Sequence, residues 1–163
     1  MSETVIQVTS LGKRIKGKTI LEDISFEINK GDCVALIGPN GAGKTVLMSC
    51  ILGDKKPSSG QVLIDGKAGK AKNKIAVLLQ ENTIPNSLKV EELIAFFQSI
   101  SDNPLTNQEV QDLLQFKEDQ YQQFADKLSG GQRRLLAFVL CLIDRPKILF
   151  LDEPTAGMDT STR

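Results

Sequence analysis

The sequence predicts an α/β fold whose core is a parallel sheet. Two apolar runs, "CVALIG" at 33–38 and "KILFLD" at 147–152, are typical of strands that are buried on both faces. Each run adjoins a segment with helical character, at 44–52 and at 129–144 respectively. Strands and helices that alternate in this way are expected to form a parallel α/β core.

The remaining elements are expected in the following order. Alternating apolar residues predict strands at 4–9 and 19–28, and two further strands are expected in "QVLIDGK" and "KIAVLLQ". From about 82 to 127 the apolar residues become sparser and recur with the spacing of a helix. This pattern predicts a small helical subdomain with an apolar face formed by Val90, Leu93, Ile94 and Phe97.

Composition limits the classes of function. The chain has 163 residues, which suggests one domain, and its 20 basic and 20 acidic residues cancel, so no nucleic-acid-binding surface is expected. Without histidine, the chain excludes a histidine-based acid–base pair. We interpret Cys33, Cys50 and Cys141 as buried thiols of a reducing compartment. The sequence has no signal pattern, and its longest apolar run, 135–143, is too short to span a membrane, so a cytoplasmic location is expected.

The stretch "GPNGAGKT" fits the pattern G-x-x-x-x-G-K-[ST] between a predicted strand and a predicted helix. Its glycines allow the backbone to curl around a phosphate, and its amides and the following helix start direct positive dipoles at the anion. Lys44 adds a full charge and Thr45 a hydroxyl for Mg²⁺. The predicted nucleotide-binding residues are Gly38, Pro39, Asn40, Gly41, Ala42, Gly43, Lys44, Thr45 and Val46. Since Val46 replaces a second hydroxyl residue, slightly weaker nucleotide binding is expected.

Two adjacent carboxylates follow the apolar residues of "ILFLDEP". Ligands usually bind at the carboxyl ends of parallel strands, where Asp152 and Glu153 are expected. One carboxylate can hold Mg²⁺ while the other polarises the attacking water. We assign Asp152 to the metal and Glu153 to the water.

The segment "KLSGGQRR" begins a predicted apolar helix with two glycines. Ser129 and Gln132 are able to form a capping box. The box does not explain Gly130 and Gly131, because each glycine costs about 1 kcal/mol in a helix relative to alanine. Bare amides at a helix start provide room for an anion, so this segment is a second candidate phosphate-binding site.

The set "GPNGAGKT", Gln80, "LSGGQ" and "ILFLDEP" followed by "AGMD" resembles the nucleotide-binding domain of the ATP-binding cassette (ABC) family. The similarity runs from about residue 4 to 163. It implies a P-loop NTPase core with a parallel sheet, an N-terminal antiparallel β subdomain and a small helical subdomain. The core and β subdomain would comprise 1–81 and 145–163, and the helical subdomain with the signature helix 82–144.

The resemblance also implies roles and partners. Two such domains dimerise head to tail, so Ser129, Gly130, Gly131 and Gln132 would serve the ATP of the partner, with Asp159 at the interface. Gln80 would touch Mg²⁺ and the attacking water. The expected function is an ATPase that energises a membrane transporter through a membrane-spanning subunit, with ATP and Mg²⁺ as cofactors. The short helical subdomain favours an exporter, and the chain would lie peripherally at the membrane.

The chain departs from the family pattern at two places. Ile15 occupies the position of an aromatic residue that stacks on adenine, so weak base selectivity is expected. The chain ends before the part of the family that carries a further strand and a histidine. A C-terminally truncated domain of low stability that hydrolyses ATP slowly, if at all, is therefore expected. Two alternatives remain open: a nucleotide-binding regulatory module without turnover, and a soluble ABC ATPase that is not a transporter subunit.

Overall fold

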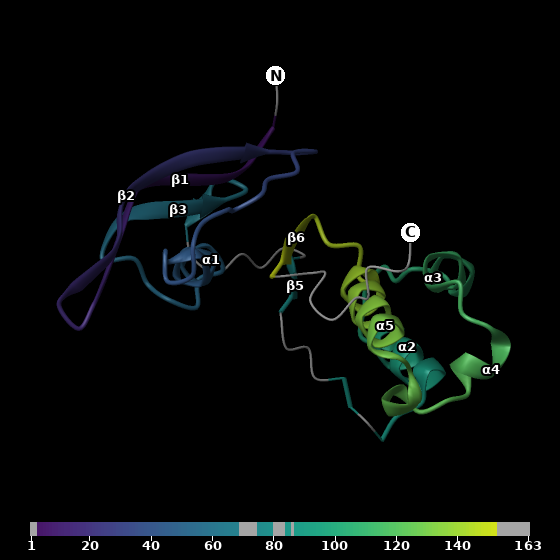
Figure 1. The fold of residues 1–163 in the computed structure, drawn as a ribbon. Coiled ribbons are helices and arrows are strands. Elements are labelled where there is room, and N and C mark those ends of the chain that lie inside the picture. Colours follow the sequence, from purple (N-terminus) through teal and green to yellow (C-terminus); the bar gives the residue numbers. More distant parts are fainter. Residues whose placement is uncertain (1–2, 69–74, 80–83, 86, 153–163) are drawn as a thin grey trace. The chain divides into compact units, whose positions relative to one another are not determined.

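The computed structural model describes residues 3–68, 75–79, 84–85 and 87–152. The chain forms two compact units, Met1–Lys72 and Asn73–Arg163, and each is described by itself. Figure 1 shows strands dominating the first unit and helices dominating the second. The subdivision predicted from the sequence, with boundaries near 82 and 144, stays a prediction.

The first unit contains the expected antiparallel sheet. Its strand order is β2-β1-β3-β4, and the strands are β1 (Thr4–Ile15), β2 (Lys18–Asn29), β3 (Ser59–Ile64) and β4 (Lys67–Ala68). Lys16 and Gly17 join β1 to β2 with positive φ angles of 48° and 78°, as a tight two-residue hairpin turn requires. In the paired strands Val8 lies opposite Phe26 and Val62.

One helix accompanies this sheet. Helix α1 (Lys44–Ile51) contacts β2 and buries Leu47, Cys50 and Ile51. Strand β1 buries Ile6, Val8 and Leu11. The apolar face of α1 packs within the first unit. This packing also fixes the first turn of α1, which directly follows the glycine-rich loop.

The strand predicted at 33–38 is not formed. Residues 32–39 have irregular backbone, and the side chains of Val34 and Ile37 are 60% and 90% exposed. A continuous apolar run of this kind requires parallel neighbours on both sides. The strand pairs that the structure describes in the first unit are all antiparallel, so the run finds no such neighbour among them. The prediction that Cys33 is buried is also wrong, because its side chain is exposed, whereas Cys50 is buried as expected.

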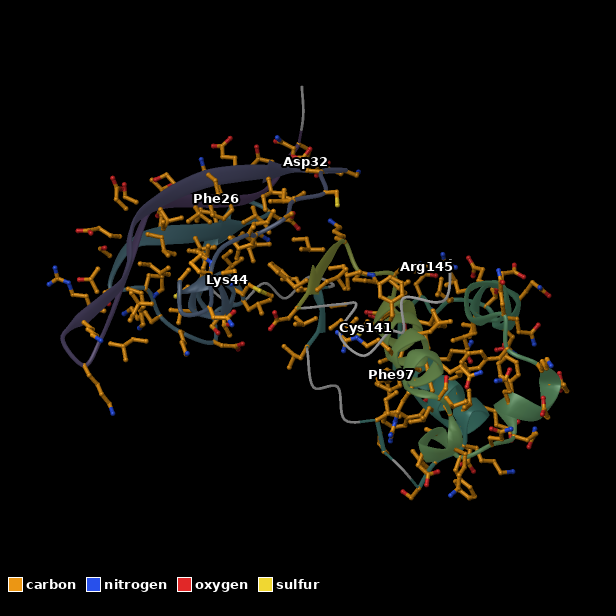
Figure 2. The ribbon with its side chains drawn as sticks, in the orientation of Figure 1. Phe26, Asp32, Lys44, Phe97, Cys141 and Arg145 are labelled. Atoms are coloured by element: carbon orange, nitrogen blue, oxygen red, sulfur yellow. The ribbon has the colours of Figure 1, made fainter. Side chains whose placement is uncertain are left out.

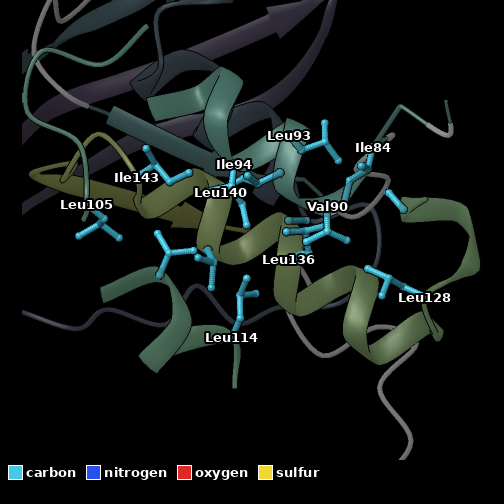
Figure 3. Packing of buried hydrophobic residues seen from close by; sticks show 14 of the residues in the cluster. Ile84, Val90, Leu93, Ile94, Leu105, Leu114, Leu128, Leu136, Leu140 and Ile143 are labelled. Atoms are coloured by element: carbon cyan, nitrogen blue, oxygen red, sulfur yellow. The ribbon is translucent and has the colours of Figure 1, made fainter. Parts of the chain in front are cut away.

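The second unit contains the predicted helices. They are α2 (Val90–Ser99), α3 (Asn107–Leu114), α4 (Glu118–Tyr121), the 3₁₀ helix η1 (Ala125–Lys127) and α5 (Gly130–Leu142). Val90, Leu93 and Ile94 are buried on one face of α2, and Phe97 packs against the same core. Figure 3 shows the side chains of Val90 and Ile94 packed near those of α5, including Leu136 and Leu140. The helical spacing in the sequence therefore identified the packing face correctly.

Two parallel strands complete the second unit. Strand β5 (Ile75–Leu78) pairs with β6 (Ile148–Leu151), with Val77 opposite Phe150. Parallel strands need a long crossover, which the helices between β5 and β6 supply. Helix α5 contacts β5, and the Cys141 thiol lies 3.7 Å from the carbonyl oxygen of Val77. The pair confirms the predicted parallel sheet, although the partner of β6 in the described residues is β5 and not the run at 33–38.

Among the helices of the described ranges, none combines the length and the apolarity that a membrane span needs.

Candidate nucleotide-binding site

The glycine-rich loop lies between the irregular segment and α1 in the first unit. Gly41 and Gly43 have φ angles of 84° and 90°, which favour glycine. The Ala42 amide donates to the Pro39 carbonyl oxygen at 3.2 Å, which closes the loop on itself. A Cβ atom at Gly43 would lie 2.9 Å from a methyl group of Leu21 and 3.2 Å from the Ile20 carbonyl oxygen, so any side chain there would require β2 to give way.

Lys44 folds back over this loop. Its Nζ atom donates to the carbonyl oxygens of Gly38 and Pro39, at 2.6 and 3.0 Å. Figure 2 shows the side chain on the first turn of α1. The two contacts hold a positive charge close to the backbone of the loop, where an anion can compete for the same ammonium hydrogens.

The start of α1 is open to an anion. Its N-cap residue, Gly43, makes no side-chain cap, and the first turn carries no acidic residue. Thr45 is exposed in this turn, and Val46 is half-buried. Neither the N-cap residue nor the first turn therefore supplies a side-chain oxygen that compensates the helix dipole. These features fit a polyphosphate such as that of ATP.

Ile15 lies at the end of β1, beside the hairpin turn. It pairs with Lys18 across the hairpin and is 36% exposed. Its apolar side chain is accessible for a contact with a flat ligand, although an aliphatic group provides no ring stacking.

The start of α5 in the second unit carries the capping box predicted from the sequence. The Ser129 Oγ atom accepts a hydrogen bond from the Gln132 amide at 3.2 Å, and the Gln132 Oε1 atom accepts one from the Ser129 amide at 3.0 Å. A Cβ atom at Gly131 would meet nothing within 4 Å. Among the described residues, packing therefore gives no reason for a glycine at this position.

Asp152 directly follows β6. Its amide donates to the Leu78 carbonyl oxygen at 2.9 Å, so the residue is fixed where the parallel pair ends. Three predicted site residues, Gln80, Glu153 and Asp159, lie outside the described residues. The structure therefore places the glycine-rich loop in the first unit, and the α5 start and Asp152 in the second.

The sequence interpretation missed Arg134. This side chain is only 8% exposed, and its guanidinium donates to the carbonyl oxygens of Leu79 at 2.6 Å and Asp152 at 3.2 Å. It thereby ties α5 to the ends of both parallel strands. A signal was available, because Arg134 is three residues from Ala137 and seven from Cys141, which places all three on the face of α5 nearest β5.

The fold and the loop together define a nucleotide-binding α/β domain of the P-loop class. A family model described as ABC transporter matches residues 21–156. The chain belongs to this family, whose members bind ATP with Mg²⁺ as the usual cofactor.

Curated relatives agree with the family. The chain is 35% identical to a spermidine/putrescine import ATP-binding protein of Protochlamydia amoebophila, over 94% of this chain and 43% of the relative. It is also 35% identical to a methionine import ATP-binding protein of Legionella pneumophila, over 97% of this chain and 50% of the relative. A Nod factor export ATP-binding protein of Ralstonia nicotianae is 33% identical over 99% of this chain and 53% of the relative. The chain thus spans about half the length of these relatives.

Solved structures support the fold. The ATP-binding subunit of an ABC transporter aligns with a TM-score of 0.79 at 24% identity, covering 96% of this chain and 69% of the other. A bacterial Atm1-family ABC exporter with ATP bound aligns with a TM-score of 0.78 at 24% identity, covering 96% of this chain and 30% of the other. This likeness identifies the P-loop NTPase fold.

Proposed function

We propose that this protein is an ATP-binding and ATP-hydrolysing subunit that energises a membrane ABC transporter. The observation that carries the proposal is the glycine-rich loop, where Lys44 is held over two backbone carbonyls beside an uncapped start of α1. Membership of the ABC transporter family supports the assignment of the bound anion as ATP.

The residues divide the work by chemistry. The loop amides and Lys44 bind the phosphates, because a charged donor and aligned amides complement a polyanion. Thr45, Gln80 and Asp152 are the proposed ligands of Mg²⁺. When bound, Mg²⁺ neutralises phosphate charge. Glu153 accepts a proton from the attacking water, so its replacement is expected to abolish turnover while nucleotide binding remains.

A second chain is proposed to complete each site. Ser129, Gly130, Gly131 and Gln132 at the start of α5 contact the ATP held by the partner, with Asp159 at the interface. The capping box between Ser129 and Gln132 and the lack of any described atom within 4 Å of a Cβ at Gly131 support this role. Ile15 offers the adenine ring an apolar contact without stacking, so weak base selectivity is expected.

A membrane-spanning subunit is the proposed partner of the helical subdomain, which places the protein at the cytoplasmic face of the membrane. We further propose that the transporter is an exporter, because the segment between Gln80 and Leu128 is short. The names of the relatives include import and export proteins, so they support transport without selecting its direction.

The function is tested by phosphate release from ATP and Mg²⁺ across a range of protein concentrations. We expect the rate per chain to rise with concentration, because the active form is a dimer. Glu153→Gln should bind ATP without turnover. Lys44→Ala should weaken ATP binding about tenfold or more, the effect of losing a charge-assisted hydrogen bond.

Lys55→Ala is the matched control, because it removes an exposed lysine just beyond α1. ATP binding that is equal in the wild type and in Lys44→Ala would contradict the proposed site. Binding without release at any concentration would instead favour the regulatory module without turnover.

A further inference from the structure

Arg134 is a charged side chain that lies inside the second unit. It is 8% exposed, and no other polar or charged residue is buried in the part of the chain that the structure describes. Taking a guanidinium out of water costs free energy unless its donors are bonded. An apolar side chain could fill the same space on α5 without that cost. What distinguishes the guanidinium from such a side chain is the set of groups to which it donates.

The two hydrogen bonds of Arg134 reach the first residue beyond each parallel strand. Strand β5 ends at Leu78 and β6 at Leu151, and these two residues are paired. Arg134 Nη1 donates to the Leu79 carbonyl oxygen at 2.6 Å, and Nη2 donates to that of Asp152 at 3.2 Å. Both nitrogen atoms belong to one planar group, so their separation is fixed. The guanidinium thus holds the two carbonyl oxygens in a defined arrangement just beyond the strand pair.

Asp152 is thereby fixed on both sides of its Cα atom. Its amide donates to the Leu78 carbonyl oxygen at 2.9 Å, and its own carbonyl oxygen accepts from Arg134. A peptide group is planar, so fixing a carbonyl also fixes the plane of the bond to the next residue. After the two carbonyls that Arg134 holds, the next residues in the sequence are Gln80 and Glu153. Arg134 therefore acts on the backbone that carries or leads into three of the proposed metal-binding and catalytic residues.

The helix that carries Arg134 begins at the proposed contact with the partner's ATP. Arg134 follows Ser129 by five residues, and the Arg133 amide donates to the Ser129 carbonyl oxygen at 2.8 Å. Further along α5, the Cys141 thiol lies 3.7 Å from the Val77 carbonyl oxygen. The helix is thus attached to the β5 segment through two of its side chains. A displacement of the α5 start is therefore transmitted to the ends of both strands.

We propose that Arg134 is a positioning residue of the ATPase, which couples the start of α5 to the metal-binding and catalytic end of the site. It orients Gln80, Asp152 and Glu153 through the backbone of the strand ends. Its effect should fall on the step that needs Mg²⁺ and the attacking water, and not on the binding of phosphates by the glycine-rich loop. The roles of the three residues rest on the proposed function, whereas the contacts of Arg134 do not.

Arg134→Lys tests this role with a small change. Lysine keeps the charge, but its compact ammonium cannot hold both carbonyl oxygens as the planar fork does. Arg145→Lys is the matched control, because it makes the same substitution in the same unit. Arg145 bonds the exposed carboxylate of Glu109 and precedes β6, whereas Arg134 bonds the residue that follows it. Circular dichroism measures the folded fraction of each variant under the assay conditions.

The first measurement is steady-state phosphate release with ATP varied in the presence of Mg²⁺. We expect Arg134→Lys to lower kcat about tenfold and to change KM less than about twofold, because misplaced groups slow the reaction without weakening phosphate binding. Arg145→Lys should change kcat less than about twofold, since it alters only an exposed ion pair. A loss of stability alone would lower kcat only by the unfolded fraction.

The second measurement does not depend on turnover. ATP binding is measured with Mg²⁺ and again with EDTA, on chains that also carry Glu153→Gln so that ATP stays intact. The ratio of the two affinities isolates the contribution of the metal. Arg134→Lys should lower this ratio about threefold or more, as expected when the support of a metal ligand is lost, and should leave the affinity in EDTA within about twofold. Arg145→Lys should leave both quantities within about twofold.

A wild-type kcat together with a wild-type ratio in Arg134→Lys would overturn the proposal and leave the proposed function intact. Equal losses in Arg134→Lys and Arg145→Lys would also overturn it, because a general weakening of the unit would then explain both. If the wild type binds ATP without releasing phosphate, hydrolysis is rejected and the ratio alone decides the role of Arg134. A wild type that binds no ATP would overturn both the proposed function and the role of Arg134.

Discussion

Arg134 is a buried charged residue that links helix α5 to the two parallel strands. Its guanidinium donates to the carbonyl oxygens of Leu79 and Asp152, at the ends of the two parallel strands. Replacing it with methionine keeps much of the volume and leaves both carbonyls without this donor. Each lost buried hydrogen bond costs about 1–3 kcal/mol, so Arg134→Met should lower the free energy of unfolding by about 3 kcal/mol.

Urea denaturation followed by circular dichroism measures this loss. Arg134→Lys is a useful second variant. Its ammonium group can donate to one of the two carbonyl oxygens, but it is too small to reach both as the guanidinium does. It should fall between the wild type and Arg134→Met. A methionine variant as stable as the wild type would show that the contacts to the strand ends contribute nothing.

Glu109 and Arg145 form an exposed pair whose effect depends on pH. Arg145 Nη2 lies 2.7 and 2.6 Å from the two carboxylate oxygens, and the Arg145 side chain is labelled in Figure 2. The hydrogen bond from Arg145, then those from Thr106, lower the pKa of Glu109 from 4.5 to about 2. The native state thus binds this proton less readily than the unfolded state. The stabilisation is present above pH 4.5 and is lost as the pH falls towards 2.

Denaturation midpoints of the wild type and Glu109→Gln test this effect. The stability difference between the two proteins should be constant above pH 5 and shrink as the pH falls from 4.5 towards 2. A difference that stays constant over that interval would contradict the coupling. Raised salt should reduce the difference at neutral pH, because the pair is exposed.

The start of α5 is the element where local stability and function are expected to conflict. A Cβ atom at Gly131 would meet nothing within 4 Å of it, so Gly131→Ala should fit without strain. Alanine should raise the free energy of unfolding by up to about 1 kcal/mol, through its higher helix propensity. The same methyl group should hinder the approach of the partner's phosphate and lower the rate of phosphate release.

Thermal unfolding and phosphate release, measured on the same preparation of Gly131→Ala, separate the two effects. Ser129→Ala is a useful comparison, because losing the cap should cost about 1 kcal/mol of stability. If Gly131→Ala were more stable and fully active, the glycine would have no role in binding a partner's nucleotide.

Several elements could be predicted because their causes are local. The capping box at Ser129 and Gln132 and the apolar face of α2 follow from residues close in the sequence. The strand predicted at 33–38 had no such local cause. Its formation depends on parallel neighbours, and its own unit supplies only antiparallel pairs. Arg134 escaped prediction for a related reason, since its partners are 55 and 18 residues away.

At the scale of the whole molecule, the residues of the predicted site belong to two different units of the chain. The glycine-rich loop belongs to Met1–Lys72, whereas the α5 start and Asp152 belong to Asn73–Arg163. The motifs predict the residue types of the site from sequence alone, because phosphate and Mg²⁺ demand particular donors at fixed local spacing. Sequence spacing does not determine how separate chains combine, so the composite site is tested by combining different chains.

Mixing two inactive variants tests the composite site most directly. Lys44→Ala removes the loop charge, and Ser129→Arg blocks the α5 start. If sites form head to tail, a mixed dimer contains one site in which both parts are intact. An equimolar mixture should then recover about a quarter of the wild-type rate of phosphate release, since random pairing makes half of the dimers mixed. A mixture as inactive as either variant alone, while the wild type is active, would contradict the account.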